Sequence, residues 1–363
     1  MLNFDLNYKA AVLLSPGNIQ IRNLKINKLE KDEVIVRVSF CTLCPTDIRK
    51  YSGTLKIPAP LILGHEVSGI VESKGIEVRD LREGDKVAVL PMIPCGYCRY
   101  CILGLPELCD NLVGIGASAG SLDKCAELLR EKEWGGGFAE YVKVPRNNII
   151  KLNENVPVKT ASLMEPLANV IRAQTICSPS PSKIEAIFGG GPIGLLHLIA
   201  AKNLGVSKVL LVEPIQERRE LALEYGASQV INPNEENPVE EIRRHTDGFG
   251  ADIVIVTVGG KTGTKCIEMS IDAAAKNGRI ILFASSHPST YMNVDPNTIH
   301  YKELRLIGSF AAHPIHFFEA INLISQKSEE LNKLIYPTMN LENISEAFHL
   351  YGKPGSMKIA IEP

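Results

Sequence analysis

Four cysteines lie close together in the sequence at a spacing that suits a metal ion. Cys95, Cys98, Cys101 and Cys109 follow one another at intervals of three, three and eight residues. This spacing meets the rule for zinc sites, and four thiolates can surround one tetrahedral ion. A site with four protein ligands keeps no open position for a substrate, so the sequence predicts a structural zinc.

Two short motifs nearer the N-terminus carry further side chains that bind metals or move protons. They are Cys44-Pro45-Thr46-Asp47 and Gly64-His65-Glu66. Neither motif means much alone, because a lone Cys or His usually belongs to a core. A third feature is Glu165, near the start of a predicted helix, where the helix dipole favours negative charge.

A glycine-rich stretch past the midpoint has the context of a nucleotide-binding loop. Gly189-x-Gly191-x-x-Gly194 follows a short apolar segment and opens a helix that begins Pro192-Ile193. Such glycines permit a tight turn, approach of the backbone to a pyrophosphate, and close packing of helix on strand. The second predicted strand ends on Glu213, at the distance where an acid binds a ribose hydroxyl. The stretch predicts a dinucleotide site.

The elements that position these residues divide the chain in two. From Lys9 to Pro91, short apolar segments separated by polar turns predict a β-rich domain. From Lys183, strands alternate with helices, which predicts a doubly wound parallel sheet. The strands expected there are 186–188, 209–212, 229–231, 253–258, 279–283 and 304–308. The tail beyond Phe317, with a strand at 358–361, is expected to return to the first domain.

Secondary structure is also predicted for two connecting segments. A helix is expected over Ser121–Leu129, and a strand over Gly135–Val142. The remaining cysteines lack partners in sequence and are interpreted as packing residues: Cys41, Cys125, Cys177 and Cys266.

Composition excludes several classes of function. The formal net charge of −2 implies neither a nucleic acid nor an acidic membrane surface as a partner. No apolar run reaches membrane-spanning length, and the N-terminus lacks the pattern of a signal peptide. The cysteines are odd in number and clustered, which suits metal binding in a reducing cytoplasm better than disulfides.

Taken in order, these motifs resemble those of the zinc-dependent medium-chain dehydrogenases, the superfamily of alcohol, sorbitol and threonine dehydrogenases. The matching motifs include the stretches around Cys44, His65 and Glu165, the four cysteines and the glycine loop. The resemblance implies a GroES-like catalytic domain, residues 1–164 and 310–363, with a zinc lobe at 95–109. It implies a Rossmann domain over residues 165–309.

The resemblance also assigns roles to residues. Cys44 and His65 would bind a catalytic zinc, and Asp47 would orient His65. Either Glu66 or Glu165 would complete the ligand set, and both stay open as catalytic residues. Thr46 would hand on a proton from the substrate. Two zinc ions per chain and one NAD are therefore implied, with a small alcohol or polyol as substrate and a homodimer or homotetramer as assembly.

Two departures from the family pattern concern the surroundings of this site. Arg49 stands where many members have a histidine that relays the proton, and an arginine cannot act as a base. Residues 117–133 resemble an insertion that either shapes the substrate mouth or forms a surface loop without a role.

The predicted activity is hydride transfer between a secondary alcohol, such as a polyol or sugar, and a nicotinamide cofactor. Glu213 favours NAD over NADP because it would repel a 2′-phosphate, although Arg218 and Arg219 lie nearby. A threonine 3-dehydrogenase is the alternative enzyme. A zinc-ribbon nucleic-acid binder would need a basic patch, and a non-catalytic relative would not explain why Cys44, His65, Asp47 and Glu165 occur together.

Overall fold

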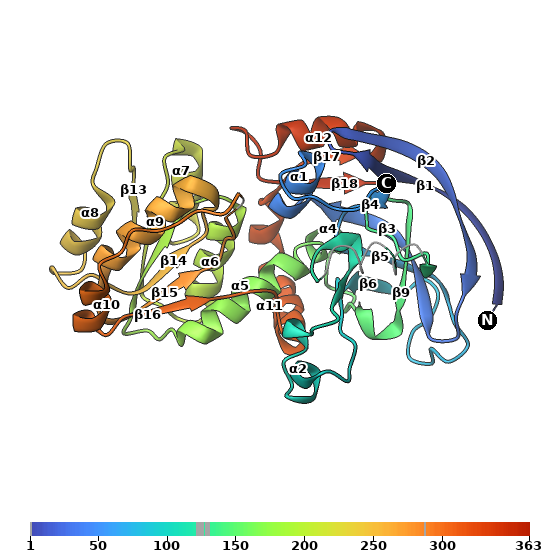
Figure 1. The fold of residues 1–363 in the computed structure, drawn as a ribbon, viewed down its shortest axis with the longest axis horizontal. Helices are drawn as coiled ribbons and strands as arrows, with labels where there is room; N and C mark the ends of the chain where they lie inside the picture. Colours follow the sequence, from blue (N-terminus) through green and yellow to red (C-terminus); the bar gives the residue numbers. More distant parts are fainter. Residues whose placement is uncertain (1, 121–126, 128–130, 287) are drawn as a thin grey trace. The chain divides into compact units, whose positions relative to one another are not determined.

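A computed structural model describes residues 2–120, 127, 131–286 and 288–363. The chain forms two compact units (Figure 1). Unit 1 comprises Met1–Ala168 and Ala312–Pro363, and unit 2 comprises Asn169–Ala311. The predicted helix Ser121–Leu129, with Cys125, lies outside the described residues apart from Glu127.

Unit 1 is β-rich, as predicted, and its larger sheet contains the last strand of the chain together with strands from its first half. The sheet order is β10-β6-β5-β3-β18-β17, and β9 pairs with β3. Its strands are β3 (Glu33–Thr42), β5 (Glu66–Lys74), β6 (Lys86–Val89), β9 (Tyr141–Pro145), β10 (Ile149–Lys151), β17 (Ile335–Asn340) and β18 (Lys358–Glu362). The predicted return of the tail is confirmed, because β18 pairs antiparallel with β3.

Unit 1 also contains two smaller sheets and several helices. A three-stranded sheet contains β1 (Leu2–Ser15), β2 (Asn18–Leu29) and β4 (Leu61–Ile62), and β7 (Met92–Ile93) pairs with β8 (Val113–Gly114). The helices are α1 (Pro45–Tyr51), α2 (Arg99–Ile102), α4 (Val158–Ala161), α11 (Pro314–Asn332) and α12 (Ile344–Leu350).

Strand register in the larger sheet determines which side chains meet near the N-terminus of α1. Thr42 of β3 lies opposite Glu66 of β5 and, on its other side, opposite Ala360 of β18. Residues directly opposite in a sheet share a face, and so do residues two apart on one strand. Lys358 therefore lies on the same face as Thr42 and Glu66.

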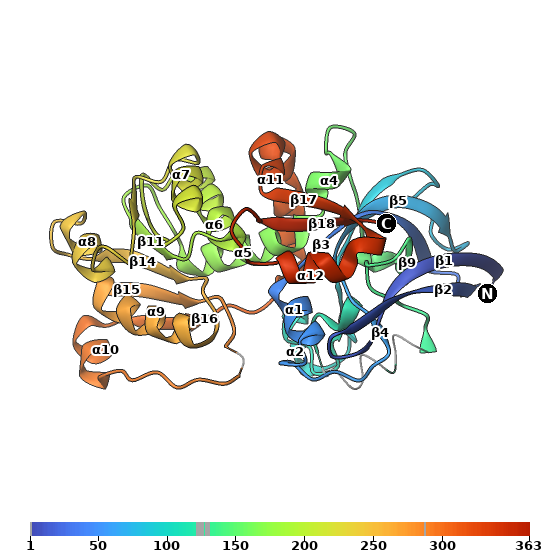
Figure 2. The same ribbon diagram turned by 90° about the horizontal axis from the view of Figure 1, so that it is seen from above.

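Unit 2 is the predicted doubly wound sheet (Figure 2). Its six strands run in the order β13-β12-β11-β14-β15-β16, and all neighbours are parallel. They are β11 (Ile184–Phe188), β12 (Lys208–Val212), β13 (Gln229–Ile231), β14 (Ala251–Val256), β15 (Ala274–Leu282) and β16 (Arg305–Gly308). The helices are α5 (Met164–Cys177), which begins in unit 1, α6 (Pro192–Asn203), α7 (Gln216–Glu224), α8 (Pro238–Arg244), α9 (Gly260–Ala273) and α10 (Pro296–Lys302).

Buried side chains of β14 show why this sheet carries helices on both faces. Ile253 and Ile255 pack in a core with Ala173 and Cys177 of α5. Val254 and Val256 pack in a second core with Cys266 and Ile271 of α9. Successive residues of a strand point to opposite faces, so a continuous apolar run needs a cover on each side. Cys41, Cys177 and Cys266 are buried and unpaired, as expected of packing residues.

The strand predicted over Gly135–Val142 is wrong in its first part, and tight backbone contacts explain the difference. These contacts lie at the break between β4 and β5, where Gly64 adopts a φ of +92°. Regular strand begins only at Tyr141, since Gly137 and Phe138 donate backbone hydrogen bonds of 2.8 and 3.0 Å to the carbonyls of Gly64 and Leu63. A Cβ on Gly136 would lie 2.2 Å from the Leu63 carbonyl oxygen.

Candidate active site

The segments that carry the first two motifs meet at the N-terminus of α1. Cys44 is the N-cap residue of this helix, two residues after the end of β3, and Glu66 begins β5 with His65 immediately before it. One ligand atom from each of Cys44, His65 and Glu66 lies within 4.8 Å of the other two. His65 and Glu66 are buried, whereas Cys44 is half-buried. The structure thus brings a thiol, an imidazole and a carboxylate together.

Asp47 lies behind this group and is completely buried. Its Oδ1 is 3.4 Å from Nδ1 of His65, and its Oδ2 accepts a 3.1 Å hydrogen bond from the backbone N–H of Cys44. Burial alone would lower the pKa of His65, but the charges of Asp47 and Cys44 raise that pKa well above its ordinary value. Asp47 thus lies against Nδ1 of His65, in the place of a carboxylate that supports a metal-binding histidine.

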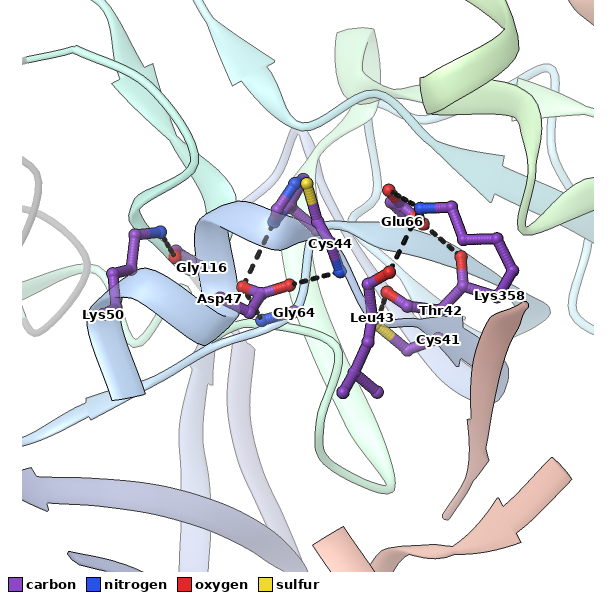
Figure 3. Close-up of polar contacts among 11 residues, drawn as sticks. Cys41, Thr42, Leu43, Cys44, Asp47, Lys50, Gly64, Glu66, Gly116 and Lys358 are labelled. Atoms are coloured by element: carbon purple, nitrogen blue, oxygen red, sulfur yellow. Dashed lines mark hydrogen bonds and ion pairs between the residues drawn. The ribbon is translucent and has the colours of Figure 1, made fainter. Parts of the chain in front are cut away.

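Glu66 has two partners that the sequence analysis missed. Lys358 donates hydrogen bonds from Nζ to both carboxylate oxygens, and Thr42 donates one from Oγ1 to Oε2 (Figure 3). Burial raises the pKa of Glu66 to about 7, although the charge of Lys358 opposes this rise. The only sequence signal is a lysine at the start of an apolar strand, 358–361, and it does not identify the partner.

The other two predicted catalytic residues lie on helices that begin near this group. Thr46 lies in the first turn of α1 and is half-buried. Glu165 lies in the first turn of α5, and its negative charge contributes to raising the pKa of Glu66. The two carboxylates are thus close enough to interact electrostatically. Glu165 is not one of the three residues whose ligand atoms lie within 4.8 Å of one another.

The chemistry of the Cys44 group fits a zinc ion. Thiolate, imidazole and carboxylate are all zinc ligands, and tetrahedral bonds of about 2.0–2.3 Å place ligand atoms roughly 3.3–3.8 Å apart. The ligand atoms of Cys44, His65 and Glu66 already lie within 4.8 Å of one another, so only small side-chain movements are needed to reach that spacing. Three protein ligands would leave one position open, which is the arrangement of a catalytic zinc.

The four cysteines of the lobe form a second, closed group, with ligand atoms also within 4.8 Å of one another. The Sγ atom of Cys98 lies 3.6 Å from that of Cys101 and 3.8 Å from that of Cys109. A tetrahedral site with zinc–sulfur bonds of about 2.3 Å would place its sulfur atoms about 3.8 Å apart. Backbone N–H groups of Cys95 and Asn111 also donate to the sulfur of Cys109, each at 3.3 Å. These residues fit a structural zinc.

The glycine loop joins β11 to α6, and the space around the α-carbon of Gly191 is open. Gly189 adopts a φ of +101°, and a Cβ on Gly194 would lie 1.8 Å from the Gly189 carbonyl oxygen. These two glycines are needed for the turn and for close packing of α6. A Cβ on Gly191 would meet only Nη1 of Arg218, at 3.7 Å. Gly191 is the N-cap of α6, and Pro192 and Ile193 form its first turn. Its open surroundings fit a pyrophosphate at a helix N-terminus.

Glu213 lies at the end of β12, against the glycine loop. Its Oε2 accepts a 2.6 Å hydrogen bond from Gly190 N–H, and its Oε1 accepts a 2.9 Å bond from Ile215 N–H. Arg219 donates to the backbone carbonyls of Glu213 and Pro214, at 2.9 and 2.7 Å. The carboxylate is thus fixed beside the loop, where a ribose would lie, and Arg219 is held by the main chain.

No helix in the described part of the chain is both long enough and apolar enough to cross a membrane.

Comparisons with known proteins cover both units. The family "Alcohol dehydrogenase GroES-like domain" matches residues 30–154, and the family "Zinc-binding dehydrogenase" matches residues 192–326. An L-threonine 3-dehydrogenase from Caldanaerobacter subterraneus is 30% identical over 345 residues, which cover 93% of this chain and 94% of the relative.

Two solved structures are similar over almost their entire length. A zinc-binding dehydrogenase structure from Sinorhizobium meliloti, bound to NADP, superposes with a TM-score of 0.89 at 29% identity, covering 99% of this chain and 100% of that one. The 2R,3R-butanediol dehydrogenase of Bacillus subtilis superposes with a TM-score of 0.85 at 27% identity, covering 98% and 99%.

Proposed function

Because this chain belongs to the zinc-dependent medium-chain dehydrogenases, we propose that it transfers a hydride between a secondary alcohol and NAD at a zinc centre formed by Cys44 and His65. The alcohol that we favour is a polyol or a sugar-like compound. The observation that carries the proposal is the group of Cys44, His65 and Glu66, with Asp47 behind His65.

When bound, the zinc would polarise the oxygen of the alcohol or of the product carbonyl. The residues of the chain have separate tasks around it. Cys44 and His65 would hold the ion, and Asp47 would keep the ring of His65 in one orientation. Glu66 or Glu165 would supply the carboxylate of the ligand set. Thr46, in the first turn of α1, would take up the proton of the alcohol hydroxyl while its own hydroxyl proton leaves to solvent water.

Unit 2 would hold the cofactor by its phosphates and by one ribose. The N-terminus of α6, from Gly191 to Gly194, offers backbone N–H groups to the pyrophosphate. Glu213 would accept hydrogen bonds from the adenosine ribose, with Arg218 beside the loop. NAD is therefore the favoured cofactor. Because a relative has been solved with NADP bound, NADP is the cofactor against which NAD must be tested.

A second zinc would have no part in the reaction. We infer that Cys95, Cys98, Cys101 and Cys109 bind it and thereby stabilise the lobe, since a closed zinc site contributes folding free energy directly.

L-threonine 3-dehydrogenase activity is the second candidate. It is favoured by the similarity of the whole chain to such an enzyme. The butanediol dehydrogenase relative, which by its name acts on a diol, favours the first candidate.

We also propose that the protein assembles as a homodimer or homotetramer in the cytoplasm. The lobe exposes large apolar side chains that a second copy would cover, namely Tyr97, Ile102, Leu103 and Leu108. The thiol-rich lobe itself suits a reducing compartment. Light scattering that gives the mass of a single chain would refute the assembly.

The experiment that tests the function is an oxidation assay on a panel of alcohols, polyols and L-threonine with NAD, followed by absorbance of the reduced nicotinamide. Metal analysis of the same preparation should give two zinc ions per chain. Turnover in a preparation without zinc would refute the proposed chemistry.

A further inference from the structure

A lysine is buried beside the proposed catalytic zinc site. Lys358, in β18, is 1% exposed, and its ammonium group bonds both carboxylate oxygens of Glu66 and, at 3.1 Å, the carbonyl oxygen of Leu43 (Figure 3). Burial of an ammonium is costly unless it is paired and hydrogen-bonded. Glu66 and Leu43 meet both requirements, so the position of Lys358 is well determined.

These contacts occupy much of the bonding capacity of Glu66. A carboxylate has about four lone-pair sites. Lys358 uses one on each oxygen, and the hydroxyl of Thr42 uses another on Oε2. The positive charge of the ammonium also neutralises the charge that would attract a cation.

Glu66 nevertheless lies within reach of the same ion as Cys44 and His65, because their ligand atoms are within 4.8 Å of one another. Lys358 and the metal therefore compete for one carboxylate. Glu165 lies in the first turn of α5 nearby and provides a second carboxylate, whereas the ammonium of Lys358 bonds Glu66 and the Leu43 carbonyl.

We propose that Lys358 is a positioning residue that holds the Glu66 carboxylate away from the catalytic zinc, so that a coordination position stays open for the alcohol. This inference rests on the proposed zinc site at Cys44 and His65. It assigns the carboxylate of the ligand set to Glu165 and gives Glu66 the task of binding Lys358 and Thr42.

The test uses the full-length protein with Co²⁺ in place of the catalytic zinc. Cobalt absorption in the visible range responds to ligand number and weakens as coordination rises from four to five. In Lys358→Met, Glu66 should join the ion, so this absorption should weaken and kcat should fall roughly 10- to 100-fold, the range for residues that orient metal ligands. In Lys358→Met/Glu66→Gln the spectrum should return to that of the unmodified protein. Lys358→Arg, which keeps the positive charge, should leave the spectrum unchanged.

Two outcomes would overturn the proposal. One is an unchanged cobalt spectrum in Lys358→Met, which would make the contact with Glu66 purely structural. The other is a changed spectrum that persists in the double variant. Lys358→Met leaves a buried carboxylate without its cation, so it is the variant at risk of not folding. If Lys358→Met does not fold, the single variant Glu66→Gln provides the test. The proposal requires its cobalt spectrum to match that of the unmodified protein, and a different spectrum would overturn it.

Cys44→Ser separates this inference from the proposed function. If the cobalt spectrum does not respond to Cys44→Ser, the ion is not bound there, and both proposals fail. If it responds to Cys44→Ser but not to Lys358→Met, only the role of Lys358 is refuted.

Discussion

The Oδ1 atom of Asp47 lies 3.4 Å from Nδ1 of His65, with both side chains buried. The same carboxylate accepts a hydrogen bond from the N–H of Cys44, so one residue contacts both proposed zinc ligands. Its pKa is lowered, since His65 and Lys50 outweigh the effect of burial, and the carboxylate stays ionised.

Asp47→Asn should therefore reduce zinc affinity and kcat/KM roughly 10- to 100-fold. The amide keeps the size of the side chain but removes the negative charge that orients the imidazole. Zinc titration and steady-state kinetics measure the two effects. Asp80→Asn is the control, because Asp80 is an exposed partner of Arg146 and should leave both quantities unchanged. Full activity in Asp47→Asn would contradict the assigned role.

The two proposed zinc sites should respond differently to loss of a cysteine. Cys98→Ser should lower the melting temperature by about 10 °C or more, since a closed zinc site supplies folding free energy. Cys44→Ser should abolish turnover with little change in melting temperature. Each variant should lose one of two zinc ions by metal analysis. Equal thermal destabilisation of the two variants would show that the sites do not have separate roles.

The cofactor preference depends on Glu213. The unmodified protein should have a higher kcat/KM with NAD than with NADP, because the carboxylate accepts ribose hydroxyls and repels a 2′-phosphate. Glu213→Ser should narrow that preference roughly 10- to 100-fold, the value of a hydrogen bond or two to a charged group. Kinetics with both cofactors measure the ratio. A preference of the unmodified protein for NADP would show that Arg218 determines the choice instead.

The substrate prediction concerns an adjacent hydroxyl. A vicinal diol should be oxidised more efficiently than its deoxy analogue, because the proposed ligand Glu165 would place an acceptor near the reacting carbon. A site that bonds a second hydroxyl penalises the analogue that leaves its acceptors unpaired. Comparing kcat/KM for a polyol and its deoxy analogue tests this. Equal values would remove the diol argument, and faster oxidation of L-threonine would favour the second candidate.

A buried carboxyl in unit 2 makes stability depend on pH. Glu185 lies on β11, bonded to Gln174 at 2.8 Å, and burial raises its pKa to about 8 from an ordinary value of 4.5. The folded chain thus binds an extra proton between these pH values. The stabilising contribution is complete below pH 4.5 and is lost as the pH rises toward about 8.

Glu185→Gln removes this proton uptake and keeps the shape of the side chain. Its free energy of unfolding, relative to that of the unmodified protein, should rise by a few kcal/mol between about pH 5 and pH 9. Denaturant unfolding at several pH values measures the difference. Glu235→Gln, a substitution on the exposed surface, should show no such trend. A constant difference for Glu185→Gln would mean that Glu185 is ionised in the folded protein.

The sequence alone determined the features that depend on neighbouring residues. The glycine loop, the cysteine lobe and the alternation of strands and helices in unit 2 are local patterns, because a turn, a metal-binding loop and a buried strand each require particular residues at short spacing. The parallel sheet of unit 2 and the β-rich character of unit 1 were predicted correctly on that basis. The strand predicted over Gly135–Val142 failed because the carbonyls of Leu63 and Gly64, distant in sequence, bind its backbone.

Only the tertiary structure decided what surrounds Glu66. The sequence left two carboxylates as equal candidates for the zinc, and nothing near either one distinguished them. Lys358 and Glu66 are separated by 292 residues, and they meet because β18 pairs with β3 and β3 pairs with β5 in one register. A one-residue shift in either pairing would place Lys358 and Glu66 on opposite faces of the sheet. The partner of Glu66 is therefore fixed by strand register, which is set by the packing of the whole unit and leaves no local mark in the sequence.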